Sequence, residues 1–446
     1  MQGSRSGQAG DVRRLHRRAF LKQLGVVGGA LVGSHALTLR VQAQARPAVV
    51  RVGTLIDYTG ALAEFGPSHR NAVELAAAQL NEAAQRVLGG PLVELVHEDS
   101  GTTASVGIDR ARKLVEVDRV PAIIGSLASG VTIPVAESVT IPAGVVQISQ
   151  ASTSPLITFL PADTQRDFLF RTVASDALQG VVAAQLAAGE IVQGYRVRRA
   201  ATIYVNNPYG QGLSNGFAHS FQLRGGIVTA QVPVPEEPKP TYTAELALAL
   251  RGDPEVIFAA TYPGQAVVYM KEAVEVFGFS NFQYTDGTKS EEIVRVLGAS
   301  VVEGQLGTAP GSDPEWEGFR AFAQAYEARY GQRPPLPYMD TAYDAMAVIG
   351  LAIARAHLDG VAVTGAALRD RLRQVANPPG ERVGPGEFER ALRLLQQGQS
   401  VDYTGAAGPV DFDDAGDVVT PVEVWRYAGG TIETVTIRRA DQIPAE

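Results

Sequence analysis

The sequence predicts an α/β protein of two lobes, each with a parallel sheet covered by helices on both faces. Short apolar segments of strand length alternate with segments whose apolar residues recur at helical spacing, which is the pattern of repeated β-α-β units. The alternation stops between Ser152 and Asp167 and then begins again, which indicates a second unit that starts near residue 170. A chain of 446 residues is long enough for two or three domains.

The first lobe is predicted from seven consecutive segments. Four are short and rich in β-branched or other apolar residues, and we expect them to be strands: Val49–Leu55, Leu92–His97, Ala122–Gly125 and Gly144–Ser149. Three carry apolar residues at helical spacing, and we expect them to be helices: Asn71–Ala84, Ser105–Val117 and Val131–Ser138. Helices between successive strands favour parallel pairing, because parallel strands need such crossover connections.

The second lobe and the late part of the chain continue the same pattern. The predicted strands are Phe168–Val173, Ala200–Val205 and Val256–Ala260. The predicted helices are Leu213–Leu223, Gln265–Phe277, Glu315–Tyr330 and Thr341–Ala356. Pro233–Pro240 is predicted as a surface loop because its four prolines cannot join a sheet interior. Val410–Phe412 and Val422–Tyr427 flank the acidic segment Asp413–Asp417 and are expected to form a hairpin-like turn.

Residues 1–45 have the composition of an export signal. They contain seven basic residues and one acidic residue, followed by a Gly-interrupted apolar run (Leu24–Leu39) and the small-x-small cleavage pattern Ala43-Gln44-Ala45. The segment around Arg17-Arg18 resembles a twin-arginine signal. The alternative, a membrane anchor, is disfavoured because the run is short and rich in Gly. We therefore expect a soluble periplasmic or otherwise extracytoplasmic protein, cleaved near Ala45.

Composition excludes several classes of function. The net charge is −8 for the whole chain and −14 after residue 45, which argues against a nucleic-acid partner. The absence of Cys excludes disulfides, thiolate metal sites and Cys nucleophiles. The six His are scattered without metal-ligand spacing, and neither a nucleophile elbow nor a dinucleotide fingerprint occurs. We expect no catalytic residues, no metal and no cofactor.

One acidic segment is similar to a calcium loop. The acidic residues of Asp411–Asp417 are spaced like the carboxylate ligands at the start of a calcium loop. Val422, however, stands where such a loop places its bidentate Glu. A solvated turn is therefore the preferred interpretation.

Hydroxylated and aromatic residues follow the predicted strands of both lobes. Ligands of doubly wound sheets bind at the carboxyl ends of the strands. In the first lobe, Ser129 and the backbone N–H groups of a helix start would suit a carboxylate, and the loop Ser149–Pro155 adds Thr153. In the second lobe, Tyr262 offers an aromatic wall and Asp286 a negative charge. Opposite charges from two lobes would suit an α-amino acid, whereas helix capping by these Ser and Thr residues is the alternative.

An ordered set of motifs resembles the type I periplasmic binding proteins for branched-chain amino acids. The resemblance runs over nearly all of residues 48–430. Its motifs are Val52-Gly53-Thr54-Leu55, Thr59-Gly60, Gly66, Asp109–Val117, Ile123–Ser126, Ile148–Pro155, Arg171-Thr172, Asp176, Gln179-Gly180, Tyr209–Gly212, Tyr343–Ala345, Gly408–Phe412 and Gly416-Asp417.

This resemblance implies two lobes joined by a three-crossover hinge that close over a ligand. Residues 46–172 and 309–408 would form the first lobe, and residues 173–308 and 409–446 the second. The ligand would be delivered to an ATP-driven (ABC) membrane permease, a transient partner, and the protein is expected to be a monomer.

The resemblance also implies roles for individual residues. Ser129 would bind the ligand carboxylate, while the Ala151 carbonyl and Thr153, with Ser152 between them, would hold the carboxylate and ammonium groups. Asp286 would face the ammonium group. The expected aromatic contacts are Phe65, at the side-chain pocket, Tyr209 and Tyr262.

The chain departs from the family pattern in two places. Gly101 and Ala128 stand where leucine-type members carry a Cys pair, and Asp286 replaces a longer Glu, with Lys289 three residues later. The family also takes up amides, urea, aromatic acids and other small acids, so these ligands stay alternatives to an amino acid. An exported enzyme and the ligand-sensing part of a receptor are the alternatives from other classes.

Overall fold

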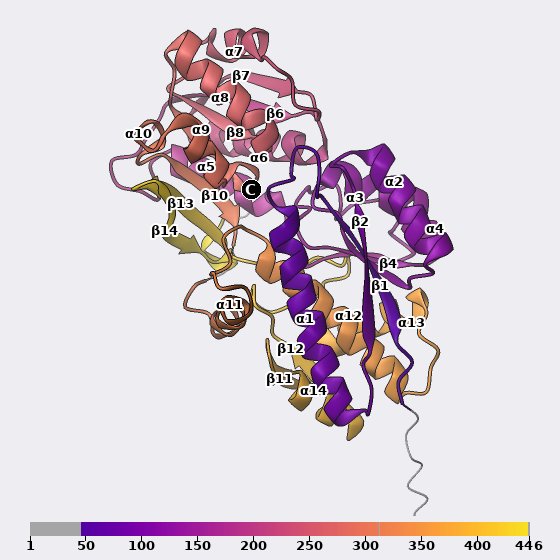
Figure 1. The fold of residues 1–446 in the computed structure, drawn as a ribbon. Coiled ribbons are helices and arrows are strands. Elements are labelled where there is room, and N and C mark those ends of the chain that lie inside the picture. Colours follow the sequence, from indigo (N-terminus) through magenta and orange to yellow (C-terminus); the bar gives the residue numbers. More distant parts are fainter. Residues whose placement is uncertain (1–45, 312, 445–446) are drawn as a thin grey trace, which may run out of the picture. The chain divides into compact units, whose positions relative to one another are not determined.

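The computed structural model describes residues 46–311 and 313–444, which form two lobes, each built on its own sheet (Figure 1). The first sheet has five parallel strands in the order β2-β1-β3-β4-β5. Their bounds are β1 (Val50–Ile56), β2 (Val93–Asp99), β3 (Ala122–Gly125), β4 (Val146–Ser149) and β5 (Leu169–Arg171). The expected export signal, residues 1–45, lies outside the described residues and stays a prediction.

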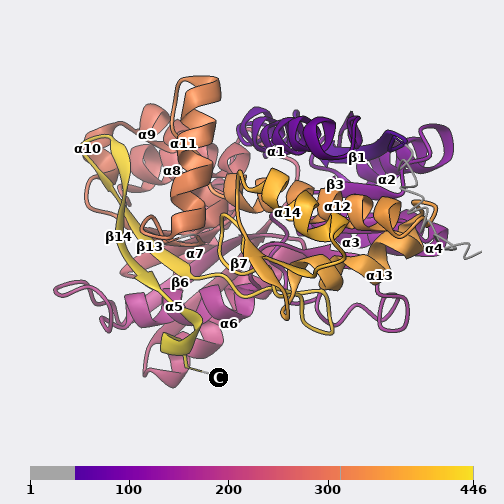
Figure 2. The ribbon, with the colours of Figure 1, turned by 90° about the horizontal axis from the view of Figure 1, so that it is seen from below.

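Helices cover both faces of this sheet. The early ones are α1 (Gly66–Val87), α2 (Ala104–Arg112), η1 (Lys113–Val117), α3 (Ser129–Val135), η2 (Ala136–Thr140) and α4 (Ile141–Ala143). The late elements are α11 (Glu317–Tyr330), α12 (Met339–Leu358), α13 (Gly365–Ala376), α14 (Phe388–Gln396) and the short strands β11 (Glu381–Val383) and β12 (Val401–Tyr403). Successive strand residues point to opposite faces, so Ile123 packs with α2 and α3 whereas Ile124 packs with α1 and α12. Figure 2 shows α12 and α14 beside α1.

The second sheet has seven strands in the order β14-β13-β10-β9-β8-β6-β7, with β13 and β14 antiparallel at one edge. The strands are β6 (Arg199–Val205), β7 (Ile227–Val234), β8 (Val256–Ala260), β9 (Phe282–Tyr284), β10 (Leu306–Pro310), β13 (Val422–Ala428) and β14 (Thr431–Arg438). The helices are α5 (Asp176–Ala187), α6 (Pro208–Leu223), α7 (Thr243–Leu250), α8 (Pro263–Phe277), η3 (Asp286–Thr288), α9 (Glu291–Leu297), α10 (Ala299–Val302) and η4 (Ala440–Gln442). The predicted two-lobed α/β architecture is confirmed.

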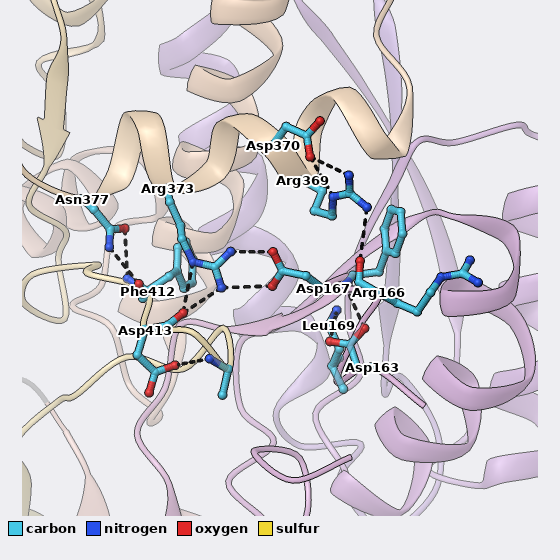
Figure 3. Close-up of polar contacts among 12 residues, drawn as sticks. Asp163, Arg166, Asp167, Leu169, Arg369, Asp370, Arg373, Asn377, Phe412 and Asp413 are labelled. Atoms are coloured by element: carbon cyan, nitrogen blue, oxygen red, sulfur yellow. Dashed lines mark hydrogen bonds and ion pairs between the residues drawn. The ribbon is translucent and has the colours of Figure 1, made fainter. Parts of the chain in front are cut away.

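The chain passes between the lobes three times, namely between β5 and α5, between β10 and α11, and between β12 and β13. The last of these passages is tied to α13, as Figure 3 shows. The Arg373 guanidinium binds both carboxylate oxygens of Asp167, at 2.6 and 3.0 Å, and also donates to the carbonyl of Asp413 at 2.7 Å. The Asn377 side chain makes a pair of hydrogen bonds with the backbone of Phe412.

The structure corrects three predictions about strands. Pro233 and Val234, predicted to begin a surface loop, are the last residues of the edge strand β7, where Pro233 pairs with Tyr204. The segment predicted as Phe168–Val173 does not open the second lobe, because β5 pairs with β4 and completes the first sheet. Val410–Phe412 is not a strand. Its apolar side chains are buried in the first-lobe core, with Phe412 packed against Phe170. The true hairpin joins β13 to β14 through Gly429-Gly430, both at positive φ, as a tight two-residue turn requires.

Candidate functional site

A pocket of about 320 Å³ lies where loops of the two lobes meet. It is lined by ten residues: Leu62, Phe65, Leu127, Ser129, Ala151, Tyr209, Tyr262, Asp286, Gly287 and Tyr338. Six of the eight predicted site residues are among them, and Ser152 and Thr153 are not.

Two first-lobe loops are joined beneath the pocket by buried hydroxyl groups. The Ser149 hydroxyl donates to the Ser126 carbonyl at 2.7 Å, and the Ser152 hydroxyl lies 2.9 Å from the Leu127 carbonyl. The Ser154 N–H donates to the Ser129 hydroxyl at 3.3 Å. Ser152 therefore holds the two loops together, and its side chain does not line the pocket.

Arg171, at the end of β5, binds the same loop and does not line the pocket. Its fully buried guanidinium forms a bidentate pair with Asp417, with both distances 2.6 Å. It also donates to the Ser154 carbonyl at 3.0 Å and to the Thr158 hydroxyl at 2.7 Å. The interpretation of Asp411–Asp417 as a solvated turn is therefore wrong for Asp417, which is a buried ion-pair partner.

A second buried acid holds the loop that carries Leu127 and Ser129. Asp57 follows β1 and accepts hydrogen bonds from the Ser100 hydroxyl at 2.6 Å and the Leu127 N–H at 3.3 Å. Burial raises the pKa of Asp57 to about 6, against the opposing effect of these hydrogen bonds. Sequence reasoning missed this residue.

Asp286 stands on the second-lobe wall of the pocket, at the start of η3. Its carboxylate accepts hydrogen bonds from the Gln179 amide at 2.8 Å and from the Tyr209 hydroxyl at 3.0 Å. Asp176, at the start of α5, is also fully buried and accepts from the Thr153 hydroxyl at 2.8 Å. Burial raises the pKa of both carboxyls, and the charge of Asp286 raises that of Asp176 further. Thr153 thus supports an acid near the pocket and does not line the pocket itself.

Aromatic rings make up much of the remaining wall. Tyr209 and Tyr262 are stacked, with ring centroids 5.4 Å apart, and the Tyr262 hydroxyl accepts from the Asn207 amide at 3.0 Å. Phe65 and Tyr338 complete the aromatic lining. Tyr338 was not predicted, because it precedes α12 at a position that no strand-end argument reaches.

The ten lining residues include one carboxylate and no Lys or Arg. The pocket wall is therefore acidic and aromatic, a combination that favours a cationic group on a bound molecule. No group of His, Asp or Glu residues in the described part of the chain has the arrangement of a metal site.

The lobes also contact each other around the pocket. The Ser154 hydroxyl donates to the Pro208 carbonyl at 2.9 Å, the Gly264 N–H donates to the Ala61 carbonyl at 3.3 Å, and Ser290 is hydrogen-bonded to Glu64. The pocket is thus bounded by both lobes in a closed arrangement.

Comparisons with known proteins agree with this architecture. The model of one family, described as periplasmic binding protein, matches residues 49–424. The chain belongs to the periplasmic binding protein family. Its type I, branched-chain amino acid branch is the one predicted from the ordered motifs, and that recognition is confirmed.

Two curated relatives of this binding protein cover much of its length. The chemotactic signal transduction system substrate-binding protein BasB of Halobacterium salinarum is 26% identical over 406 residues, which is 86% of this chain and 88% of the relative. An amino acid binding protein of Pseudomonas aeruginosa is 27% identical over 266 residues, 59% of this chain and 68% of the relative.

Solved structures share the fold of this binding protein. The leucine binding protein LivK of Thermotoga maritima has a TM-score of 0.70 at 24% identity, covering 88% of this chain and 99% of that one. LivJ of Streptococcus pneumoniae, in complex with isoleucine, has a TM-score of 0.69 at 20% identity with the same coverage. A solute binding protein of R. palustris in complex with benzoate has a TM-score of 0.65 at 19% identity, covering 90% and 99%. Within the described residues of this binding protein, no helix has both the length and the apolar character needed to cross a membrane.

Proposed function

We propose that this protein is the exported solute-binding protein of an ABC importer, and that its ligand is an α-amino acid, branched-chain or related. The observation that carries the proposal is that Ser129 of the first lobe and Asp286 of the second line the same pocket. An α-amino acid presents a carboxylate and an ammonium group a few ångströms apart, and such a pair needs opposite partners on opposing walls.

The two ends of the ligand would be bound by different chemistry. Ser129 and Gly130 begin α3, where backbone N–H groups precede the first intrahelical hydrogen bond and are free for a carboxylate. On the other side, Asp286 and the face of Tyr209 would bind the ammonium group by charge and by cation–π attraction. Phe65 would pack against an apolar side chain.

Capture follows from the two-lobed design. Ligand contacts from both lobes exist together only when the lobes are closed, so the ligand stabilises the closed state by its differential affinity for it. The closed protein, acting as a monomer in the periplasm after cleavage near Ala45, would then dock on its permease. The lobes would divide near residues 172 and 308, as expected above. The third division, expected at 408, would instead lie after Asp417, because Val410–Phe412 pack in the first-lobe core and Asp417 pairs with Arg171.

The acidic lining disfavours the alternative ligands that lack a cation. A benzoate-like acid would bring a second negative charge towards Asp286, and urea or an amide would leave that charge without a cationic partner. An amino acid neutralises it.

Calorimetry with three related compounds tests the proposal. L-leucine carries both charged groups, isoamylamine lacks the carboxylate and isocaproate lacks the ammonium group. We expect leucine to bind most tightly, isoamylamine weakly, and isocaproate least. Preferential binding of isocaproate or benzoate would replace the amino acid by an organic acid, and no binding of any of these compounds or of other amino acids at millimolar concentration would contradict the proposed function.

A further inference from the structure

A basic surface lies at the end of the second sheet that is opposite to the pocket. The pocket residues Tyr209, Tyr262 and Asp286 follow the carboxyl ends of β6, β8 and β9. At the other end, β6 and β7 begin and α6 and α7 end. We call residues 189–199, 222–229 and 248–255 the basic corner. Because β6 has seven residues, about 23 Å of strand separates the basic corner from the pocket end of the sheet.

Contacts between backbone and side chains join the three segments of the basic corner. The Ile227 N–H donates to the Arg198 carbonyl at 2.8 Å. The Arg224 guanidinium pairs with Glu190 at 3.2 Å, which ties the end of α6 to the segment before β6. The Glu255 carboxylate accepts a hydrogen bond from the Arg198 N–H. The three segments therefore form one continuous surface.

The basic corner stands out in an acidic protein. It contains five Arg and three acidic residues, whereas residues 46–446 as a whole carry a net charge of −14. Arg196, Arg198 and Arg251 are exposed and form no ion pair with any described residue. Two of the three acids make the contacts just given, and the third, Asp253, is exposed. Three guanidinium groups are therefore available to an external anion.

Large apolar side chains are exposed beside these arginines. Leu223 at the end of α6, Ile227 at the start of β7 and Leu248 on α7 are 62%, 54% and 46% exposed. Exposed aliphatic groups next to unpaired cations are typical of surfaces that rest on a lipid headgroup region. Protein interfaces instead rely on exposed Tyr and Trp, and none of these three side chains is aromatic. The composition of the basic corner therefore favours a bilayer over an acidic protein as its partner.

We infer that the basic corner is a docking surface for an anionic lipid bilayer. The three arginines would bind lipid phosphates, and the three aliphatic side chains would enter the boundary between headgroups and acyl chains. The acidic remainder of the protein would be repelled by the same membrane, so the basic corner would set the orientation. The pocket, at the other end of the sheet, would stay accessible. This inference goes beyond the proposed function and does not depend on the identity of the ligand.

Co-sedimentation with vesicles tests the inference, using the exported and processed protein so that the basic residues 1–45 do not contribute. The probes are vesicles of phosphatidylcholine alone and of phosphatidylcholine mixed with phosphatidylglycerol. We expect binding to the mixed vesicles that weakens at high salt, and little binding to the neutral ones. The double variant Arg196→Gln/Arg198→Gln should lower the partition coefficient about fivefold for each arginine. Leu223→Ser/Ile227→Ser should lower it several-fold without changing the salt dependence.

The matched control is Arg329→Gln/Arg333→Gln, which removes two exposed arginines from the first lobe. It changes the net charge equally and should bind mixed vesicles as the wild type does. Equal losses in the two arginine variants, or equal binding of the wild type to neutral and mixed vesicles, would overturn the inference. Binding to soluble poly-L-glutamate as tight as to mixed vesicles, and insensitive to Leu223→Ser/Ile227→Ser, would also overturn it in favour of an acidic protein.

Leucine calorimetry on the same variants separates this inference from the proposed function. Arg196 and Arg198 do not line the pocket, so Arg196→Gln/Arg198→Gln should bind leucine as the wild type does. That result also shows that the variant is folded. Absence of vesicle binding with leucine binding intact would overturn the membrane surface alone, and absence of leucine binding with vesicle binding intact would contradict the proposed function alone.

Discussion

The side-chain amide of Gln179 donates a 2.8 Å hydrogen bond to the carboxylate of Asp286. Gln179 lies on α5 three residues after Asp176, so one helix face brings a second buried acid to the same region. Oδ1 of Asp176 and Oε1 of Gln179 are buried without a hydrogen-bond partner among the described residues. The second-lobe wall therefore combines two buried carboxyl groups with buried oxygens that have no hydrogen-bond donor. A cationic group on the ligand would offset the negative charge and could donate to such oxygens.

The first prediction concerns the charge of Asp286. Asp286→Asn keeps the shape of the side chain and removes its charge, so we expect a loss of about 10- to 100-fold in affinity for leucine, the range for a charge-assisted hydrogen bond. Titration calorimetry measures it. Glu94→Gln, an exposed acid on β2, is the control and should bind as the wild type does. Unchanged affinity in Asp286→Asn would remove this residue from the proposed ammonium site.

The second prediction concerns the fit between the lobes. A Cβ at Gly212 of α6 would lie 2.9 Å from the Pro155 ring of the first-lobe loop, whereas a Cβ at Gly216 would meet its nearest atom at 3.8 Å. Both Gly→Ala changes raise helix propensity, but only Gly212→Ala obstructs closure. We expect it to weaken ligand binding about fivefold, through an overpacking cost of about 1 kcal/mol, with Gly216→Ala as the control. Equal affinities of the two variants would contradict the closed arrangement as the binding state.

The third prediction concerns the buried pair of Arg171 and Asp417. Arg171→Met leaves the Asp417 carboxylate buried without its partner, which costs about 3–5 kcal/mol of unfolding free energy. Urea unfolding measures the loss. The ion pair of Arg382 with Asp402 is the control, because Arg382 is exposed and Arg382→Met should cost less than about 1 kcal/mol. A loss below 1 kcal/mol in Arg171→Met would show that the loop Ser149–Pro155 does not depend on Arg171.

The fourth prediction is a pH dependence carried by His69. Burial lowers the pKa of this imidazole to about 4. As the pH falls, His69 therefore becomes protonated in the unfolded chain near pH 6.5, while it stays neutral in the folded protein until the pH approaches 4. The resulting stability is present above pH 6.5 and is lost as the pH falls towards 4, by about 3 kcal/mol in all. Asp57 acts in the opposite sense, because burial raises its pKa, and it masks part of this loss in the wild type.

His69→Gln isolates the effect of the imidazole, since the Gln amide can replace the Nε2–H donor to Pro337 without titrating. We expect the stability difference between wild type and variant to shift by about 3 kcal/mol in favour of the variant between pH 7 and pH 4. Urea unfolding at several pH values measures it. Parallel pH profiles of the two proteins would mean that His69 titrates normally.

The strands of the sheets could be predicted where a continuous apolar run coincides with a central position. Ala122–Gly125 and Val256–Ala260 were predicted with the bounds of β3 and β8. β7, at an edge of the second sheet, was missed because its residues are largely half-buried or exposed and it contains Pro233. Val410–Phe412 was wrongly predicted as a strand because a loop buried in a core has the same apolar composition as a buried strand.

The candidate site could be predicted where residues follow strands or belong to a family motif, and that covers Ser129, Tyr262 and Asp286. Tyr338 and Asp57 could not be found in this way. Tyr338 reaches the pocket through a left-handed turn before a helix, and Asp57 acts through the backbone of another loop. Both depend on contacts between segments far apart in the chain, which local patterns do not contain.

The passage from β12 to β13 is fastened to the first lobe at Phe412, Asp413 and Asp417. Because the passage is bound to the first lobe at these three residues, this part of it would move with the first lobe as a rigid unit. Val418 is also buried in the first-lobe core, so the pivot for lobe opening along this passage would be confined to residues 419–421, directly before β13. A rigid passage with a short pivot would restrict lobe opening to one path. Successive ligands would then meet the two pocket walls in the same relative orientation.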